Sequence, residues 1–181
     1  MIKIAKDKKK YNRSLFIGRF QPFHLGHIWM AKQALKVSRE LIIAIGSAED
    51  SYIKDNPLTS SERIEIIIKN LKEESIPRDR FMIVPVRNIN NYALWVKHVE
   101  VLLPRFEALF TGSLVVKSLF ERENKYFIHF FNDKKKELKI SATSVRDKII
   151  SGDKSWKKML SGVTTSYLES INIEQRLMSC E

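Results

Sequence analysis

The residues best placed to do chemistry are two histidines, His24 and His27, which lie three positions apart in the segment GRFQPFHLGH, residues 18–27. An apolar run precedes this segment and a stretch with helical spacing follows it, which predicts a strand, a loop and a helix. The free amides and partial positive charge at a helix start bind anions, and Gly26 lets a phosphate approach the backbone. Two histidines beside Gly18 and Gly26 rarely meet at such a turn by chance, so the segment indicates a phosphate site.

A second candidate phosphate site is the segment SATSVR, residues 141–146. Hydroxyls and backbone amides at a helix start, followed one turn later by an arginine, suit phosphate oxygens. Taken alone, the same residues would equally form an ordinary helix cap with a solvated arginine. The candidate ligands here are Ser141, Thr143, Ser144 and Arg146.

Strands and helices that would position these residues alternate along the chain. Apolar runs predict strands at 14–18, 41–46, 81–86 and 108–112, and the run 125–131 predicts either a further strand or a loop over buried phenylalanines. Helical spacing and capping signals predict helices at 25–38, 59–74, 93–103 and 141–150, with 155–178 mostly helical. This alternation predicts an α/β fold: a Rossmann-like parallel sheet with helices on both faces, which binds ligands beyond the carboxyl ends of its strands.

The composition predicts one compact domain after a basic tail. The chain has 181 residues and a net charge of +11, of which residues 1–13 carry +5. We expect 1–13 to be a disordered tail and 14–181 to be a single domain, with its last ~25 residues as a helical extension. No apolar run reaches the length of a membrane span, which predicts a cytoplasmic protein without a membrane partner. The lone cysteine, Cys180, excludes a disulfide within the chain.

The segment 18–27 resembles the HxGH signature of the nucleotidyltransferase superfamily, in the form found in archaeal-type nicotinamide-nucleotide adenylyltransferases. Residues 141–146 resemble the second signature of that superfamily. Class I aminoacyl-tRNA synthetases share an HxGH-type motif, but the KMSKS-type loop that they need is not in this sequence. Further similar segments follow in the order that the adenylyltransferases use: GSAEDS (46–51), NPLTSSER (56–63), ALWVKHVE (93–100), FTGSLVVKSLF (110–120) and ISATSVRDKIISGD (140–153).

The resemblance implies that the protein transfers AMP from ATP to nicotinamide mononucleotide (NMN), giving NAD and pyrophosphate, with Mg²⁺ accompanying ATP and no metal held by the protein alone. It implies a homo-oligomer, often hexameric. The catalytic residues would be His24, His27 and Arg146. ATP would contact Gly18, Arg19, Phe20, Gln21, Gly26, Arg63, Gly112, Ser141, Thr143 and Ser144, and NMN would contact Asn91, Tyr92 and Trp95.

Departures from the family pattern leave other functions open. Tyr92 stands where the family has asparagine, Ser113 replaces a usual asparagine and Ala142 a usual glycine. The acceptor could therefore be nicotinate mononucleotide, phosphopantetheine or FMN. A less favoured alternative is an RNA-binding module that uses the basic tail and the lysines at 134–136.

The mechanism implied by this resemblance needs no general base, because the attacking phosphate is already ionised near neutral pH. Catalysis would depend on alignment of the two phosphates and on stabilisation of charge by hydrogen-bond donors. We expect a histidine with a pKa near 6.5 to donate to the phosphate and to gain a proton when it binds.

Overall fold

The computed structural model describes residues 9–131 and 140–180, and its centre is a five-stranded sheet in the order β3-β2-β1-β4-β5. Every pair of neighbouring strands is parallel, which confirms the predicted fold class. The strands are β1 (Tyr11–Gly18), β2 (Ser38–Ile45), β3 (Phe81–Pro85), β4 (Ala108–Thr111) and β5 (Phe127–Phe130).

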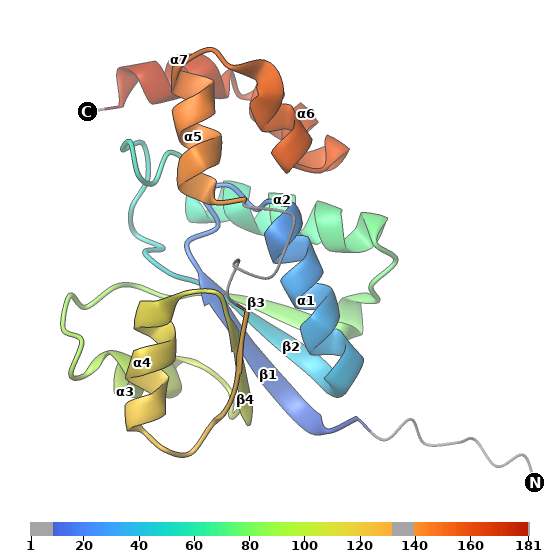
Figure 1. The fold of residues 1–181 in the computed structure, drawn as a ribbon, viewed down its shortest axis with the longest axis vertical. Coiled ribbons are helices and arrows are strands. Elements are labelled where there is room, and N and C mark those ends of the chain that lie inside the picture. The colour runs from blue at the N-terminus through green and yellow to red at the C-terminus, as the bar shows by residue number, and fades with distance from the viewer. Residues whose placement is uncertain (1–8, 132–139, 181) are drawn as a thin grey trace, which may run out of the picture.

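Helices cover both faces of this sheet (Figure 1). The helices α1 (Leu25–Val37) and α2 (Ser60–Glu73) pack on one face, and α3 (Trp95–Leu102) and α4 (Leu114–Arg122) on the other. The remaining helices, α5 (Ala142–Ile150), α6 (Gly162–Ser170) and α7 (Ile173–Ser179), form a group beyond the end of the sheet and join the α1–α2 side of the core.

Strand β2 shows how the sequence builds the two halves of the core. Side chains alternate between the faces of a strand. Leu41, Ile43 and Ile45 accordingly lie in the core beneath α1 and α2, whereas Ile42 and Ala44 lie in the core beneath α3 and α4. All five are fully buried, which explains why this strand reads as a continuous apolar run.

The predicted elements agree with the structure in type, with differences at their ends. Strand β1 begins at Tyr11, so its first three residues belong to the sheet rather than to the expected tail. The run 125–131 does form a strand, and the helical segment after residue 153 is divided into a 3₁₀ helix (Lys154–Met159), α6 and α7. Helix α4 was not predicted, although Gly112 and the capping residue Ser113 separate it from β4.

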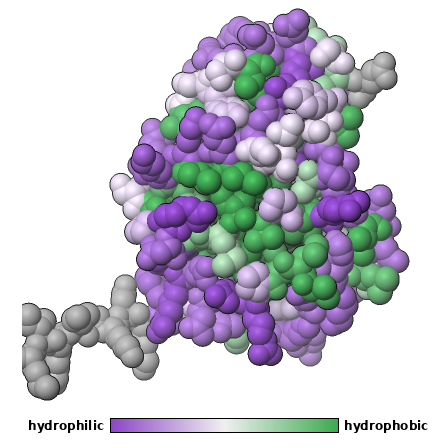
Figure 2. Space-filling view, turned by 180° about the vertical axis from the view of Figure 1, so that it is seen from behind, coloured by the Kyte–Doolittle hydropathy of each residue, from purple (hydrophilic) through white to green (hydrophobic). Residues whose placement is uncertain are grey.

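The far side of the molecule has a concentrated apolar surface. Figure 2 shows hydrophobic residues gathered across the middle of this face, with hydrophilic residues above and below them. No helix among the described residues is long and apolar enough to cross a membrane. The expected RNA contacts, the lysines at 134–136 and most of the basic tail, lie outside the described residues.

Candidate active site

A pocket of about 690 Å³ opens at the carboxyl ends of β1 and β4. These strands are neighbours in the sheet, but the chain runs from β1 to β2 on one side before it returns to β4 on the other. Such a switch point leaves a crevice between the loops, which is where open α/β sheets bind ligands. The pocket contains ten of the sixteen predicted site residues: Gly18, Arg19, Phe20, Gln21, His24, Gly26, His27, Gly112, Ser141 and Arg146.

The two histidines stack on one another inside this pocket. His24 caps the start of α1, and the rings of His24 and His27 lie with centroids 3.5 Å apart and planes 19° from parallel. The backbone amide of His24 donates to Nδ1 of His27 at 3.2 Å. A neutral His27 therefore carries its proton on Nε2, which leaves that N–H as a donor.

Small and aromatic neighbours fix the positions of both rings. A Cβ on Gly26 would come within 3.0 Å of the His24 ring, so a larger residue at this position would displace the ring. The Phe20 ring meets His27 edge to face at 4.9 Å between centroids, and Phe23 stacks on His27 at 5.4 Å. Phe20, which was predicted to contact ATP, lines the pocket from a buried position and contacts His27.

Burial keeps both imidazoles neutral near pH 7. Burial lowers the pKa of His24 to about 4. Burial and the neighbouring His24 lower the pKa of His27 well below 6.5. The expectation of a pKa near 6.5 is therefore wrong for the free protein, because removal of solvent disfavours the charged ring. Nδ1 of His24 is also buried without a hydrogen-bond partner among the described residues.

Arg146 supplies a buried positive charge at the wall of the pocket. Its side chain is only 4% exposed, and its guanidinium donates to the carbonyl of Gln21 at 3.0 Å and to the carboxylate of Asp55 at 2.7 Å. The Asp55 side chain is 69% exposed. An incoming anion can therefore displace its carboxylate from Arg146, because water can solvate the released carboxylate. Asp55 was missed from the sequence, because no local pattern pairs residues ninety-one positions apart.

Arg63 lies beneath the site and holds its loops. The guanidinium is fully buried and donates to backbone carbonyls of Arg19 at 3.1 Å, Gly46 at 3.0 Å and Ser47 at 3.1 Å. Burial lowers the pKa of Arg63 to about 10, which still leaves it charged near neutral pH. Arg63 does not line the pocket, and its contact with phosphate stays a prediction.

Gln21 also has a holding role. Its side-chain amide donates to the carbonyl of Leu58 at 2.8 Å and accepts from the amide of Leu58 at 2.9 Å. Both ends of the Gln21 side chain are therefore occupied, although the residue lines the pocket. Arg19 differs, because its side chain is exposed and makes no ion pair with any residue in 9–131 or 140–180, the part of the chain that the structure describes.

Three helix starts face the pocket. His24 caps α1, the Ser113 hydroxyl caps α4 by accepting from the amide of Val116, and the Ser141 hydroxyl caps α5 by accepting from the amide of Ser144. All three capping residues line the pocket. The convergence of three positive helix ends favours a polyanionic ligand. Thr143 and Ser144 belong to α5 but do not line the pocket.

The predicted NMN contacts lie apart from this pocket, in the loop after β3 and at the start of α3. The Asn91 side-chain oxygen accepts from the amide of Ala93 at 3.1 Å, and Tyr92 is 69% exposed. Trp95 is half-buried and meets Phe120 edge to face at 6.1 Å between centroids. None of the three lines the pocket.

One wall of the pocket is apolar and was not predicted. Trp29 and Phe131 meet edge to face there with centroids 5.1 Å apart. Met30 and Phe130 line the same pocket. Helical spacing identified Trp29 and Met30 only as helix residues, since a sequence pattern does not separate a core face from a pocket wall.

Comparison with known proteins agrees with this geometry. Residues 15–148 match the cytidylyltransferase-like family. The nicotinamide-nucleotide adenylyltransferase of Pyrococcus horikoshii is 38% identical over 165 residues, which cover 91% of this chain and 87% of that protein. That of Methanococcus aeolicus is 36% identical over 169 residues, which cover 91% of this chain and 92% of that protein.

Solved structures share the fold. A bifunctional NMN adenylyltransferase/ADP ribose pyrophosphatase from Francisella tularensis superposes with a TM-score of 0.73 and 24% identity, covering 93% of this chain; this chain spans about half (52%) of that protein. The nicotinic acid mononucleotide adenylyltransferase of Plasmodium falciparum has a TM-score of 0.60 and 13% identity, covering 91% of this chain and 98% of that one. The sequence relationships, the sheet order and the two signatures together establish that this chain belongs to the cytidylyltransferase-like family and, within it, to the nicotinamide-nucleotide adenylyltransferases.

Proposed function

We propose that this protein transfers the AMP moiety of ATP to NMN, which gives NAD and pyrophosphate. The observation that carries the proposal is the stacked pair of His24 and His27 at the start of α1, in one pocket with Arg146. Family membership supports the choice of NMN as the acceptor.

The reaction is an in-line displacement at the α-phosphorus of ATP. An oxygen of the NMN 5′-phosphate forms the new P–O bond, and the bond from the α-phosphorus to the oxygen bridging the β-phosphorus breaks. The electron pair of that bond leaves with pyrophosphate. Because the attacking phosphate is already ionised, the protein positions the two reactants and stabilises charge rather than removing a proton.

The pocket supplies a donor for each part of the triphosphate. In this proposal the Nε2–H of His27 and the amides at the start of α1 contact the α-phosphate. Arg146 and the start of α5 contact the leaving pyrophosphate, and Arg19 at the mouth reaches the terminal phosphate. Neutral imidazoles suit this task, since a fixed N–H dipole stabilises developing charge without a change of protonation.

A divalent cation fits the pocket as a partner of the nucleotide. In the part of the chain that the structure describes, no group of three or more His, Cys, Asp or Glu side chains converges to hold a metal ion. Phosphate oxygens are ligands that Mg²⁺ prefers, so ATP itself would bring and hold the ion. When bound, Mg²⁺ neutralises phosphate charge. A structure of the Francisella protein is described as complexed with AMP and a Mn ion, which supports a divalent cation here.

We propose that NMN binds beside the pocket, over the carboxyl ends of β2 and β3. The loop after β3 carries Asn91 and Tyr92 to this edge of the sheet, and Trp95 follows at the start of α3. Trp95 would offer a ring face to the electron-poor nicotinamide. Tyr92 replaces the family's asparagine, so Asn91 is the residue proposed to contact the nicotinamide amide.

The acceptor is tested by offering purified protein ATP and Mg²⁺ with NMN, nicotinate mononucleotide, phosphopantetheine or FMN in separate reactions. Products are separated by chromatography. NAD formed from NMN at the highest rate supports the proposal. A higher rate with another acceptor would keep the ATP site and overturn the assignment of NMN.

The proposal also covers the domain organisation and the oligomeric state of the protein. We propose that residues 14–181 act as one domain in a cytoplasmic homo-oligomer. The apolar surface in Figure 2 supports self-association, because large exposed apolar patches mark interfaces. Light scattering of the purified protein tests the assembly, and a monomer at micromolar concentration would contradict it.

A further inference from the structure

The loop that carries the histidines is held at alternate carbonyl groups by three different helices. Arg63 of α2 donates to the carbonyl of residue 19, and Arg146 of α5 donates to that of residue 21. The third donor is the hydroxyl of Thr164 in α6, which lies 3.2 Å from the carbonyl oxygen of Phe23. Phe23 directly precedes His24, so this last hydrogen bond is made next to the stacked pair.

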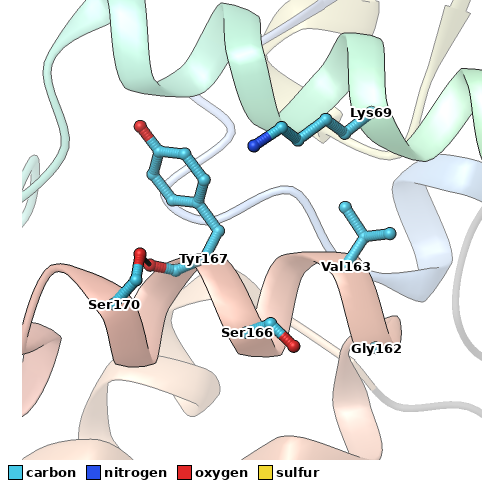
Figure 3. Close-up of a pocket in the computed structure, with 6 residues that line it drawn as sticks. All are labelled: Lys69, Gly162, Val163, Ser166, Tyr167 and Ser170. Atoms are coloured by element: carbon cyan, nitrogen blue, oxygen red, sulfur yellow. Dashed lines mark hydrogen bonds between the residues drawn. The ribbon is translucent and has the colours of Figure 1, made fainter.

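Thr164 belongs to a buried polar network between α2 and α6. Asn70 and Thr164 are both fully buried, and Nδ2 of Asn70 donates to Oγ1 of Thr164 at 2.9 Å and to the carbonyl of Ile66 at 2.7 Å. Oδ1 of Asn70 accepts from the Ser161 hydroxyl at 2.5 Å. The outer side of the same junction is a shallow cleft, in which Lys69 reaches from α2 toward the Tyr167 ring on α6 (Figure 3).

The partners in this network fix the direction of each hydrogen bond. Ser161 gives its one hydroxyl proton to Asn70 and accepts from the amide of Thr164 at 3.1 Å. Asn70 donates to Thr164 in turn, so the hydroxyl proton of Thr164 is left for the Phe23 carbonyl. Buried polar groups are costly unless paired, and here each side-chain atom of the network has a partner. A fully satisfied network of this kind specifies one geometry.

We propose that Thr164, oriented by Asn70, is a positioning residue for the adenylyl transfer: its hydroxyl holds the Phe23 carbonyl and thereby sets where the His24–His27 pair stands over the α-phosphate. This inference rests on the proposed function. It gives the C-terminal helices a part in catalysis, although the match to the cytidylyltransferase-like family ends at residue 148. A displacement of reacting groups by about 1 Å can reduce turnover on the order of 10²-fold, so one buried hydrogen bond is enough to matter.

The test replaces Thr164 with valine, which keeps the shape and removes the hydroxyl, and with serine, which keeps the hydroxyl. Thr164→Val is expected to lower kcat about tenfold while the KM for ATP changes less than threefold, and Thr164→Ser is expected to restore most of kcat. Thr165→Val is the matched control, because Thr165 lies on the same helix outside the network. Each rate is measured well below the unfolding temperature of the variant, as followed by circular dichroism.

A second measurement separates failure of this inference from failure of the proposed function. The imidazole NMR signals of His24 and His27 are expected to shift in Thr164→Val and to remain in place in Thr164→Ser and Thr165→Val. Wild-type kcat in Thr164→Val, equal loss in the valine and serine variants, or unshifted imidazole signals would each overturn the positioning role. A wild-type protein that makes no NAD would overturn the proposed function instead. The imidazole signals alone would then test whether Thr164 positions the His24–His27 pair. If Thr164→Val fails to fold, Asn70→Asp, which removes both amide donors, takes its place with the same expected results.

Discussion

His24 and His27 stack with ring centroids 3.5 Å apart, and the rings of Phe20 and Phe23 pack against His27. Two imidazolium ions do not pack in this way, because like charges repel and burial removes the water that would stabilise them. The free protein therefore presents two neutral rings at the start of α1. Burial of the histidine pair therefore affects both the stability of the fold and the chemistry of the site.

The first prediction concerns stability and pH. Burial lowers the pKa of His24 to about 4 in the folded state, whereas the unfolded value is about 6.5. Between these values the unfolded chain binds a proton that the folded chain does not. The contribution of His24 to the free energy of unfolding is therefore complete above about pH 6.5 and falls as the pH drops toward about 4, by about 1.4 kcal/mol per unit at most.

Urea denaturation at several pH values measures this effect. His24→Asn is expected to reduce the dependence between about pH 6.5 and pH 4, and the part that remains is the contribution of His27. An unaltered slope in His24→Asn would mean that His24 is charged in the folded protein.

The second prediction concerns Gly26. Alanine there would bring a Cβ within 3.0 Å of the His24 ring, so the ring must move away from its stacked position. We expect Gly26→Ala to lower kcat/KM by about tenfold or more with the fold intact. Gly162→Ala is the control, because no atom lies within 4 Å of a Cβ at that position. Equal activity of the two variants would show that the ring position does not matter.

The third prediction separates Arg63 from the catalytic residues. Removal of its guanidinium leaves the carbonyls of Arg19, Gly46 and Ser47 without their donor in a buried site. We expect Arg63→Met to lower the free energy of unfolding by about 3 kcal/mol or more, which urea denaturation measures. A stable Arg63→Met protein without activity would instead place Arg63 on the phosphates.

Much of this account could be predicted from sequence, and the limits have physical causes. A continuous apolar run located β2, and a capping box located α2. Both signals are local patterns in the sequence. Nine of the ten predicted residues that line the pocket come from the two signature segments, 18–27 and 141–146. Three features depend on contacts distant in the sequence and were not predictable: the carbonyl contacts of Arg63, the ion pair of Arg146 with Asp55, and the contact of Thr164 with Phe23.

The most direct test of the central claim follows the label from ATP that is radiolabelled at its α-phosphate, in parallel reactions of wild type and His27→Ala with NMN and Mg²⁺. The account predicts that wild type moves the label into NAD with one pyrophosphate released per NAD. It predicts that His27→Ala, with a wild-type circular dichroism spectrum, does so about 10²–10³ times more slowly. Label transfer at the wild-type rate in His27→Ala would contradict the assignment of the reaction to the stacked histidine pair.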